Sequence, residues 1–244
     1  MLIHPTGVYF CILTCVVGLL VGVYLSTTVR WSTRLLCFCS IFTLSMLCFF
    51  TAGDLIVLGV FFEMQAFALL GLLLQPQQYV SSTTLMKGTA SAALYLLGYT
   101  LLSGSLYAYG AWCCYALFGT LALELLHTAE LPMLAYVCFF LSGAIKLALA
   151  PFHIWLGKVH TEASTVGSIL LAALSLKTGF YLHVQLCSTT AGALPVAVGG
   201  VEDVVILLCI AGSWFCALVL FVQVDIKRWV ALYSLSHIQL WYAL

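Results

Sequence analysis

Two lysines of this sequence stand inside apolar stretches, where a charged side chain is unfavourable. Lys146 lies in the run GAIKLALAP and Lys177 in the run ALSLKTGF, and a polar connector with His153, His160 and Glu162 joins the two runs. A lysine at the centre of a membrane helix costs about 2.5–3.5 kcal/mol on insertion scales. Ionisable residues at such depth commonly mark proton or ion pathways. The two lysines therefore predict a proton-transfer function.

Glu63 lies at the midpoint of another apolar run, too far from either end for its carboxylate to reach the membrane surface. We expect it to face the interior of a helix bundle, with Lys146 as its partner. A Glu–Lys pair whose spacing changes would alter the affinity of the lysine for a proton. Alternatively, the two residues form a static buried ion pair that fixes the register of the helices.

Lys177 has no carboxylate within reach on its own helix, so its expected neighbours are His153, His160 and His237 from other segments. Histidine exchanges protons near neutral pH. His153 is therefore a candidate proton carrier between the two lysines. His237 is a candidate to continue this line of polar residues. Each histidine has the alternative role of a hydrogen-bonded core residue.

Pro151 predicts an interrupted helix beside Lys146. Within a helix, proline lacks an N–H and clashes with the carbonyl four residues earlier, which here belongs to Leu147. Irregular backbone at membrane depth is tolerated where it lines protein or water. The interruption would then place the lysine beside hydrated backbone. Alternatively, Pro151 only ends the helix at the surface.

The elements that must position these residues are transmembrane helices. Hydrophobic residues make up 64% of the 244-residue chain, charged residues only 7%, and the mean hydropathy is +1.17. Composition therefore predicts an all-α, polytopic transmembrane helix bundle that forms a single domain over residues 1–244, with about eight spans. The formal net charge of zero gives no reason to expect a nucleic-acid partner. The expected spans cover residues 6–28, 35–52, 53–74, 88–112, 132–151, 163–185, 203–224 and 229–244.

The apolar stretch 88–126 could hold one span or two, and loop charges favour one. With one span, all the loop cations fall on the same side of the membrane, as the positive-inside rule requires. That side is the cytoplasm or the mitochondrial matrix. The cations are Arg30, Arg34, Lys87, Lys158, Lys227 and Arg228.

The eleven cysteines give no indication of a metal site or a redox centre. Most lie inside apolar runs, where cysteine acts as a small hydrophobic residue. The sequence has no CxxC pair and no Cys/His cluster with zinc or iron–sulfur spacing. We therefore expect no cofactor in this chain.

The stretch from Lys146 to Tyr181 resembles the chain 4 family of NADH:ubiquinone oxidoreductase, respiratory complex I, whose members are antiporter-like membrane subunits. Two other motifs agree with the family: the mid-membrane Glu63, and Asp225 to Arg228 followed by His237. The matching residues of the central stretch are Lys146, His153, Trp155, Leu156, His160, Glu162, Ala163, Gly167, Ser168, Leu171, Ala172, Leu176, Lys177, Gly179 and Tyr181.

The resemblance implies a proton-pumping subunit of the mitochondrial inner membrane. Glu63 and Lys146 would modulate each other's charge, His153 would carry protons, Lys177 would be the central donor and acceptor, and His237 would continue the transfer. It further implies that flavin, iron–sulfur clusters and ubiquinone belong to other subunits of the complex. Its partners would be other membrane-arm subunits and membrane lipids.

The chain departs from the family in two respects. Ala148, Gly157 and Ser164 replace family prolines, so the shape of the break is not given by the resemblance. The chain is also shorter than family members, and its spans look like their third to tenth helices. We therefore expect a separate chain to supply the remaining helices.

Three other functions stay open on the sequence. The chain could belong to a multi-subunit cation/proton antiporter or a membrane hydrogenase, which share the Glu–Lys and central lysine positions. It could also be a structural scaffold fragment of a split subunit that no longer pumps. A b-type cytochrome would need facing histidines, for which only His183 and His237 are candidates.

Overall fold

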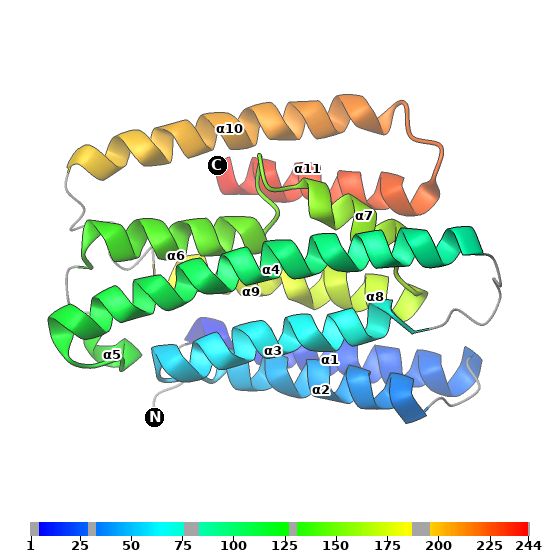
Figure 1. Cartoon of the computed structure of the whole chain (residues 1–244), viewed down its shortest axis with the longest axis horizontal. Helices are drawn as coiled ribbons and strands as arrows, with labels where there is room; N and C mark the ends of the chain where they lie inside the picture. The colour runs from blue at the N-terminus through cyan, green and yellow to red at the C-terminus, as the bar shows by residue number, and fades with distance from the viewer. Residues whose placement is uncertain (1–4, 29–32, 76–82, 127–130, 187–195, 244) are drawn as a thin grey trace.

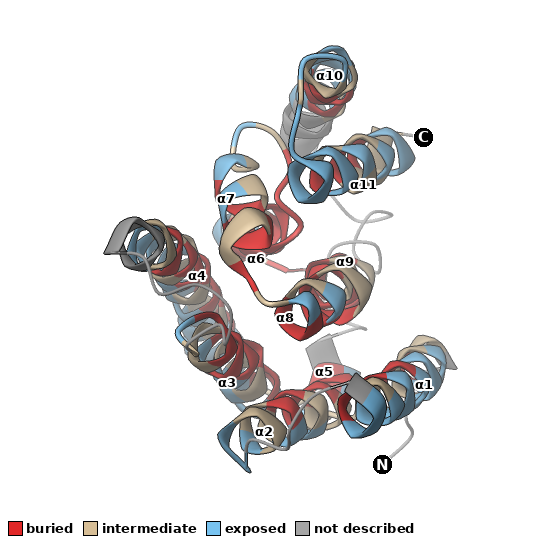
Figure 2. Ribbon diagram, turned by 90° about the vertical axis from the view of Figure 1, so that its right-hand side faces the viewer, coloured by how far each residue is buried: buried red, intermediate tan, exposed pale blue. Residues whose placement is uncertain are grey.

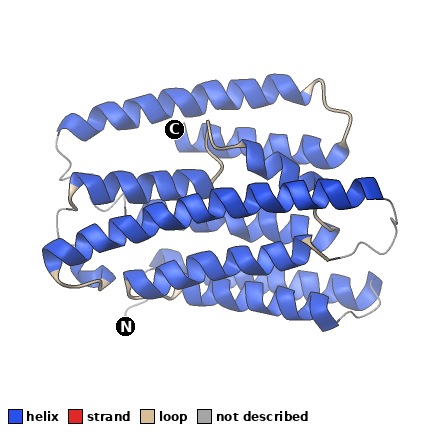
Figure 3. Ribbon diagram, viewed as in Figure 1, coloured by secondary structure: helices blue, strands red, loops and turns tan. Residues whose placement is uncertain are grey.

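The computed structural model describes residues 5–28, 33–75, 83–126, 131–186 and 196–243. Helices make up nearly all of the described part, which contains no named strand (Figure 3). This confirms the predicted all-α class. The elements are α1 (Pro5–Thr28), α2 (Thr33–Phe50), α3 (Leu55–Leu73), α4 (Thr83–Phe118), α5 (Leu123–Leu126), α6 (Met133–Lys146), α7 (Ile154–Glu162), α8 (Thr165–Leu170), the π-helical segment η1 (Leu171–Ser175), α9 (Leu176–Leu186), α10 (Val196–Leu220) and α11 (Ile226–Ala243).

Within the described part of the chain, four stretches of helix are long and apolar enough to cross a membrane, by length and composition. They are Thr6–Thr27, Thr33–Phe50, Leu55–Leu73 and Thr165–Gln185, and the last of them runs through α8, η1 and α9. Met133–Lys146 and Ile206–Leu220 are shorter apolar helices. In lipid, a helix satisfies its own backbone hydrogen bonds, which explains why these apolar runs are helical.

The long helices run side by side along one axis of the molecule (Figure 1). Viewed along that axis, α6, α8 and α9 lie between α1–α3 on one side and α10–α11 on the other (Figure 2). A single helix, α4, covers most of the stretch 88–126. The starts of α2, α4, α8 and α11 consequently lie at the same end of the bundle (Figure 1). At that end Lys227 Nζ of α11 donates a hydrogen bond to the carbonyl of Ala163, at 2.9 Å.

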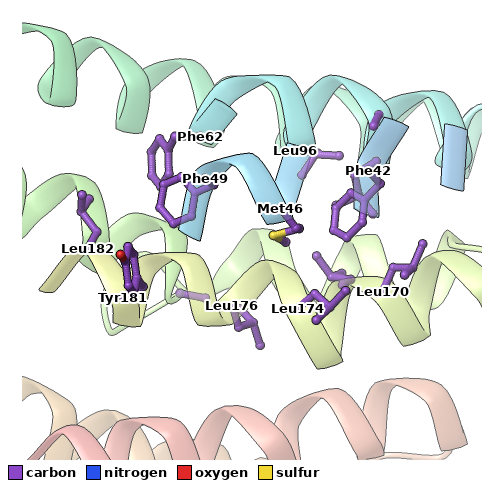
Figure 4. Packing of buried hydrophobic residues seen from close by; sticks show 14 of the residues in the cluster. Phe42, Met46, Phe49, Phe62, Leu96, Leu170, Leu174, Leu176, Tyr181 and Leu182 are labelled. Carbon is purple, nitrogen blue, oxygen red and sulfur yellow. The ribbon is translucent and has the colours of Figure 1, made fainter. Parts of the chain in front are cut away.

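Aromatic side chains hold the middle of the bundle together. The ring of Phe49 in α2 lies 5.9 Å from that of Phe62 in α3 and 5.6 Å from that of Tyr181 in α9. Figure 4 shows these rings beside the aliphatic residues of η1 and α9. The Tyr181 hydroxyl also donates a hydrogen bond to the carbonyl of Phe50, at 3.2 Å. The core thus fixes α9 against α2 and α3.

Two of the expected spans contain irregular helix in the structure. The expected span 132–151 is helical only to Lys146, and the chain becomes helical again at Ile154. The expected span 163–185 contains the π-helical segment η1. Of the loop cations, Arg30 lies outside the described residues, and the side chain of Lys87 is not described.

Candidate functional site: the helix break and the two lysines

The chain interrupts a helix between α6 and α7, and the two halves follow one another along the bundle (Figure 1). Helix α6 ends when Ala148 adopts the left-handed conformation, with φ of +56°. The Leu149 N–H then donates to the carbonyl of Ala144 at 2.9 Å, and the Ala148 N–H to that of Ile145 at 3.1 Å. These two bonds are those of a Schellman motif, in which glycine usually takes the left-handed position. The helix therefore ends before Pro151, and the sequence prediction of a break between Lys146 and Pro151 is confirmed.

Trp155 joins the two halves of the broken helix. Its side chain is buried, and its indole Nε1 donates a hydrogen bond to the carbonyl of Ile145, at 3.1 Å. That carbonyl is one of the last of α6, and such carbonyls lack a full set of partners within the helix. Trp155 thus stabilises the end of α6 from the start of α7.

Lys146 is the last residue of α6, and its side chain is only 2% exposed. Its Nζ donates a hydrogen bond to the carbonyl of Phe62, at 3.3 Å, and lies 4.4 Å from the centroid of the Phe62 ring. Both contacts are favourable for an ammonium group, because the carbonyl oxygen accepts its hydrogen bond and the face of the ring is negative. The break thus places a buried cation against the middle of α3.

Glu63 follows Phe62 in α3, so the carboxylate and the Lys146 ammonium are close enough to interact electrostatically. Among the described side chains, no ion pair within 4.0 Å joins them. The Glu63 side chain lies against Gly104 of α4, where a methyl group would be 2.5 Å from Oε1. Glu63 also lines a small cavity of about 10 Å³ with Thr100, which is near the lower limit for one water molecule. The two side chains are neighbours without forming a tight pair, and their role in proton transfer stays a prediction.

Lys177 is partly buried and makes its hydrogen bond to the helix that carries it. Its Nζ donates to the carbonyl of Ala172 five residues earlier, at 2.8 Å. Ala172 belongs to the π-helical segment η1, where the backbone register is wider than in an α-helix. In a regular α-helix that carbonyl would accept the N–H of Leu176. π-bulges are frequent at functional sites, and the sequence did not reveal this one.

Lys177 and His237 line the same cavity, which has a volume of about 540 Å³. The cavity lies between α1, α9 and α11, and most of its remaining lining is apolar and aromatic. The ring of His237 packs edge-on against Tyr233 of its own helix, with centroids 4.4 Å apart. The structure therefore brings Lys177 and His237 to one cavity. The other lining residues are Phe10, Leu147, Leu176, Phe180, Ile238, Leu240, Trp241 and Tyr242.

The remaining histidines of the central stretch lie elsewhere. His153 lies at the end of the break, and its ring contacts Phe215 of α10, with centroids 6.1 Å apart. No hydrogen bond of the described residues joins His153 to either lysine. His160 is buried in α7, near the end of the bundle where Lys227 bonds to Ala163. The predicted role of His153 as a carrier stays a prediction.

Two glycines allow α6 and α9 to approach closely. A methyl group on Gly179 would lie 2.8 Å from the carbonyl oxygen of Gly143 and 3.0 Å from the nitrogen of Leu147, both of them backbone atoms. One on Gly143 would collide with the His183 ring, whose Nδ1 lies 2.9 Å from the carbonyl oxygen of Gly179. Small residues commonly allow such contacts between membrane helices. Gly179, which the sequence showed only as part of a motif, therefore positions α9 against the end of α6.

The described residues contain no group of three or more metal-ligating side chains. His183 packs edge-on against Phe140 and Tyr242, and His237 against Tyr233.

Comparison with known proteins identifies the family. The sequence profile of the NADH:quinone oxidoreductase/Mrp antiporter transmembrane family matches residues 52–242, which include the helix break and both lysines. The chain belongs to this family. Its curated relatives include NADH-ubiquinone oxidoreductase chain 4 of Metridium senile, 31% identical over 195 residues, covering 78% of this chain and 38% of the relative. The chain 4 protein of Marchantia polymorpha is 26% identical over 246 residues, with 96% and 46% covered.

Solved structures have the same fold at lower identity. A chain of respiratory complex I from Thermus thermophilus superposes with a TM-score of 0.76 at 24% identity, and covers 94% of this chain and 47% of that one. A chain of an archaeal membrane-bound sulfane sulfur reductase gives a TM-score of 0.78 at 18% identity, with 96% and 48% covered. The chain thus spans less than half the length of these relatives and of these solved chains. At these identities the superpositions show a common fold.

Proposed function

We propose that this chain is a proton-translocating membrane subunit of respiratory complex I, in which electron transfer from NADH to ubiquinone occurs in other subunits. The observation that carries the proposal is the position of Lys146. The break ends α6 so that the buried ammonium contacts Phe62, the residue beside Glu63, in a chain whose family includes NADH:quinone oxidoreductases. Relatives named chain 4 of NADH-ubiquinone oxidoreductase support the choice of complex.

In this proposal, the spacing between Lys146 and Glu63 controls the proton affinity of the lysine. When the carboxylate is near, the ammonium form is stabilised; when it moves away, burial favours the neutral amine and a proton is released. His153, beside the break, passes protons toward Lys177. The Lys177 ammonium then loses one proton and becomes an amine, and His237, on the same cavity, takes it up.

We propose the mitochondrial inner membrane as the location, with the bundle end that carries Arg34, Lys158, Lys227 and Arg228 facing the matrix. The positive-inside rule supports this orientation. The expected partners are other membrane-arm subunits and lipids, and flavin, iron–sulfur clusters and ubiquinone are expected in other subunits. A separate chain that supplies further helices also stays a prediction; an assembled complex with no second chain carrying a mid-membrane Lys or Glu would contradict it.

A cation/proton antiporter subunit is the second candidate, because the family description includes Mrp antiporters. Affinity purification of the tagged chain from its native membrane distinguishes the two. The proposal predicts co-purification of flavin-containing and iron–sulfur subunits together with NADH:ubiquinone reductase activity. Recovery of membrane subunits alone, with cation/proton exchange in vesicles and without NADH oxidation, would overturn it. A chain that assembles but does not pump would be a scaffold.

A further inference from the structure

Gln239 of α11 is a polar residue buried in an apolar part of the bundle. Its side chain is 0% exposed, and neither Nε2 nor Oε1 has a hydrogen-bond partner among the described residues. A buried amide without partners is unfavourable, and an apolar side chain of similar size would avoid the cost. Each such group in a native structure therefore requires an explanation, of which a bound water is a common one.

The amide of Gln239 lies at the helix break. A methyl group on Gly212 of α10 would collide with Gln239 Oε1, and would lie 2.6 Å from the Cβ of Ala150 and 3.1 Å from Gln239 Cδ. Gly212, Gln239 and Ala150 therefore meet where α10 and α11 pack against the break. The absence of a side chain on Gly212 makes the space that the amide occupies.

The break offers further polar atoms on this side of the bundle. The backbone hydrogen bonds across it use the carbonyls of Ala144, Ile145 and Leu149, and within the described residues none ends on the carbonyl of Ala150. The Nδ1 atom of His153 is buried and lacks a partner among the described residues. The His153 ring contacts Phe215, which lies one helical turn after Gly212 on α10.

We propose that Gln239 binds an internal water molecule against the break, and that this water is part of the proton path beside His153. The inference rests on the proposed function. Irregular backbone at membrane depth is tolerated where it lines protein or water, and a buried water needs two to four polar partners. The amide donates through Nε2 and accepts through Oε1, so it can orient the water in two ways. A proton that enters through one hydrogen bond of the water leaves through another, and the amide keeps its own protons. Gln239 is thus a positioning residue.

The direct test is a map of the assembled complex at a resolution that shows ordered water. We expect a water peak within hydrogen-bonding distance, about 2.7–3.2 Å, of Gln239 Nε2 or Oε1 and of a polar atom of the break. The proposal is overturned if both amide atoms bond to protein groups, or if no water lies beside them.

The functional test measures the proton-to-electron ratio of the complex in sealed membranes. Gln239→Leu removes both polar atoms at similar volume, and we expect a lower ratio while NADH:ubiquinone electron transfer continues. Gln239→Asn keeps the amide and leaves room for another water, so it should restore part of the ratio. Ser236→Ala is the matched control, because the Ser236 hydroxyl bonds to the carbonyl of Tyr233 in its own helix, at 2.8 Å, and to no other described residue.

A second variant covers the case in which Gln239→Leu fails to assemble. Gly212→Ala keeps the amide but displaces it from the break, and it should lower the ratio and shift the water peak. An unchanged ratio in Gln239→Leu or Gly212→Ala, in an assay where Lys177→Ala lowers the ratio, would overturn this inference alone. An unchanged ratio in both Lys177→Arg and Lys177→Ala would instead overturn the proposed function.

Discussion

The ammonium of Lys177 lies 2.8 Å from the carbonyl oxygen of Ala172, inside the π-helical segment η1. A side chain that folds back on its own helix needs no carboxylate partner, which agrees with the apolar surroundings of this lysine. A backbone carbonyl accepts a hydrogen bond from the ammonium and from the amine alike. Lys177 can therefore change its protonation state without losing this contact, while His237 lines the same cavity.

Gly104→Ala should weaken the coupling of Glu63 to Lys146. The added methyl group would lie 2.5 Å from the Glu63 carboxylate oxygen, so the carboxylate must move. We expect a several-fold lower rate of proton translocation with the complex still assembled, measured as acidification by membrane vesicles that oxidise NADH. Gly98→Ala, in the same helix but with no atom within 4 Å of the new methyl group, should pump normally. Equal rates in the two variants would contradict the account.

Ala148→Gly should stabilise the protein. The residue has φ of +56°, and the left-handed conformation costs a residue with a Cβ about 1–2 kcal/mol. We expect a net rise of about 1 kcal/mol in the free energy of unfolding, because the entropy cost of ordering glycine offsets part of the gain. The measurement is an unfolding titration with SDS of the protein in detergent micelles. Ala148→Pro should destabilise by more than this, because proline cannot adopt a positive φ and would lose the N–H that bonds to Ile145. A stable Ala148→Pro variant would mean that the break has a different conformation.

Gly179→Ala should separate α6 from α9. Its methyl group would meet backbone atoms of Gly143 and Leu147, which cannot rotate away. Overpacking of this kind costs about 1–3 kcal/mol, and we expect that loss in the same unfolding titration. Gly22→Ala is the control, because no atom lies within 4 Å of its new methyl group. A loss no greater than that of the control would show that the close approach is not required.

The sequence predicted the helical class and the break, and it singled out both lysines as candidates, because charge in an apolar run is visible without coordinates. It could not predict where the break begins. Pro151 was the visible signal, but the helix ends earlier, at the Schellman motif in which Ala148 takes the left-handed position. The π-helical segment had no sequence signal at all. The contacts of Gly104 with Glu63 and of Gly212 with Gln239 depend on which helices are neighbours, and the sequence does not show this. The one sequence signal for Gln239 was the presence of a glutamine among apolar residues of a helix.

Proton translocation by the assembled complex with Lys177→Arg shows whether Lys177 carries a proton. Arginine keeps the positive charge of the lysine but does not release its proton in proteins. We expect Lys177→Arg to lower the proton-to-electron ratio as much as Lys177→Ala does, while the complex assembles in normal amount. An unchanged ratio in both variants would contradict it and leave the chain as a scaffold. Normal pumping by Lys177→Arg alone would show that the site needs a charge and not a proton carrier.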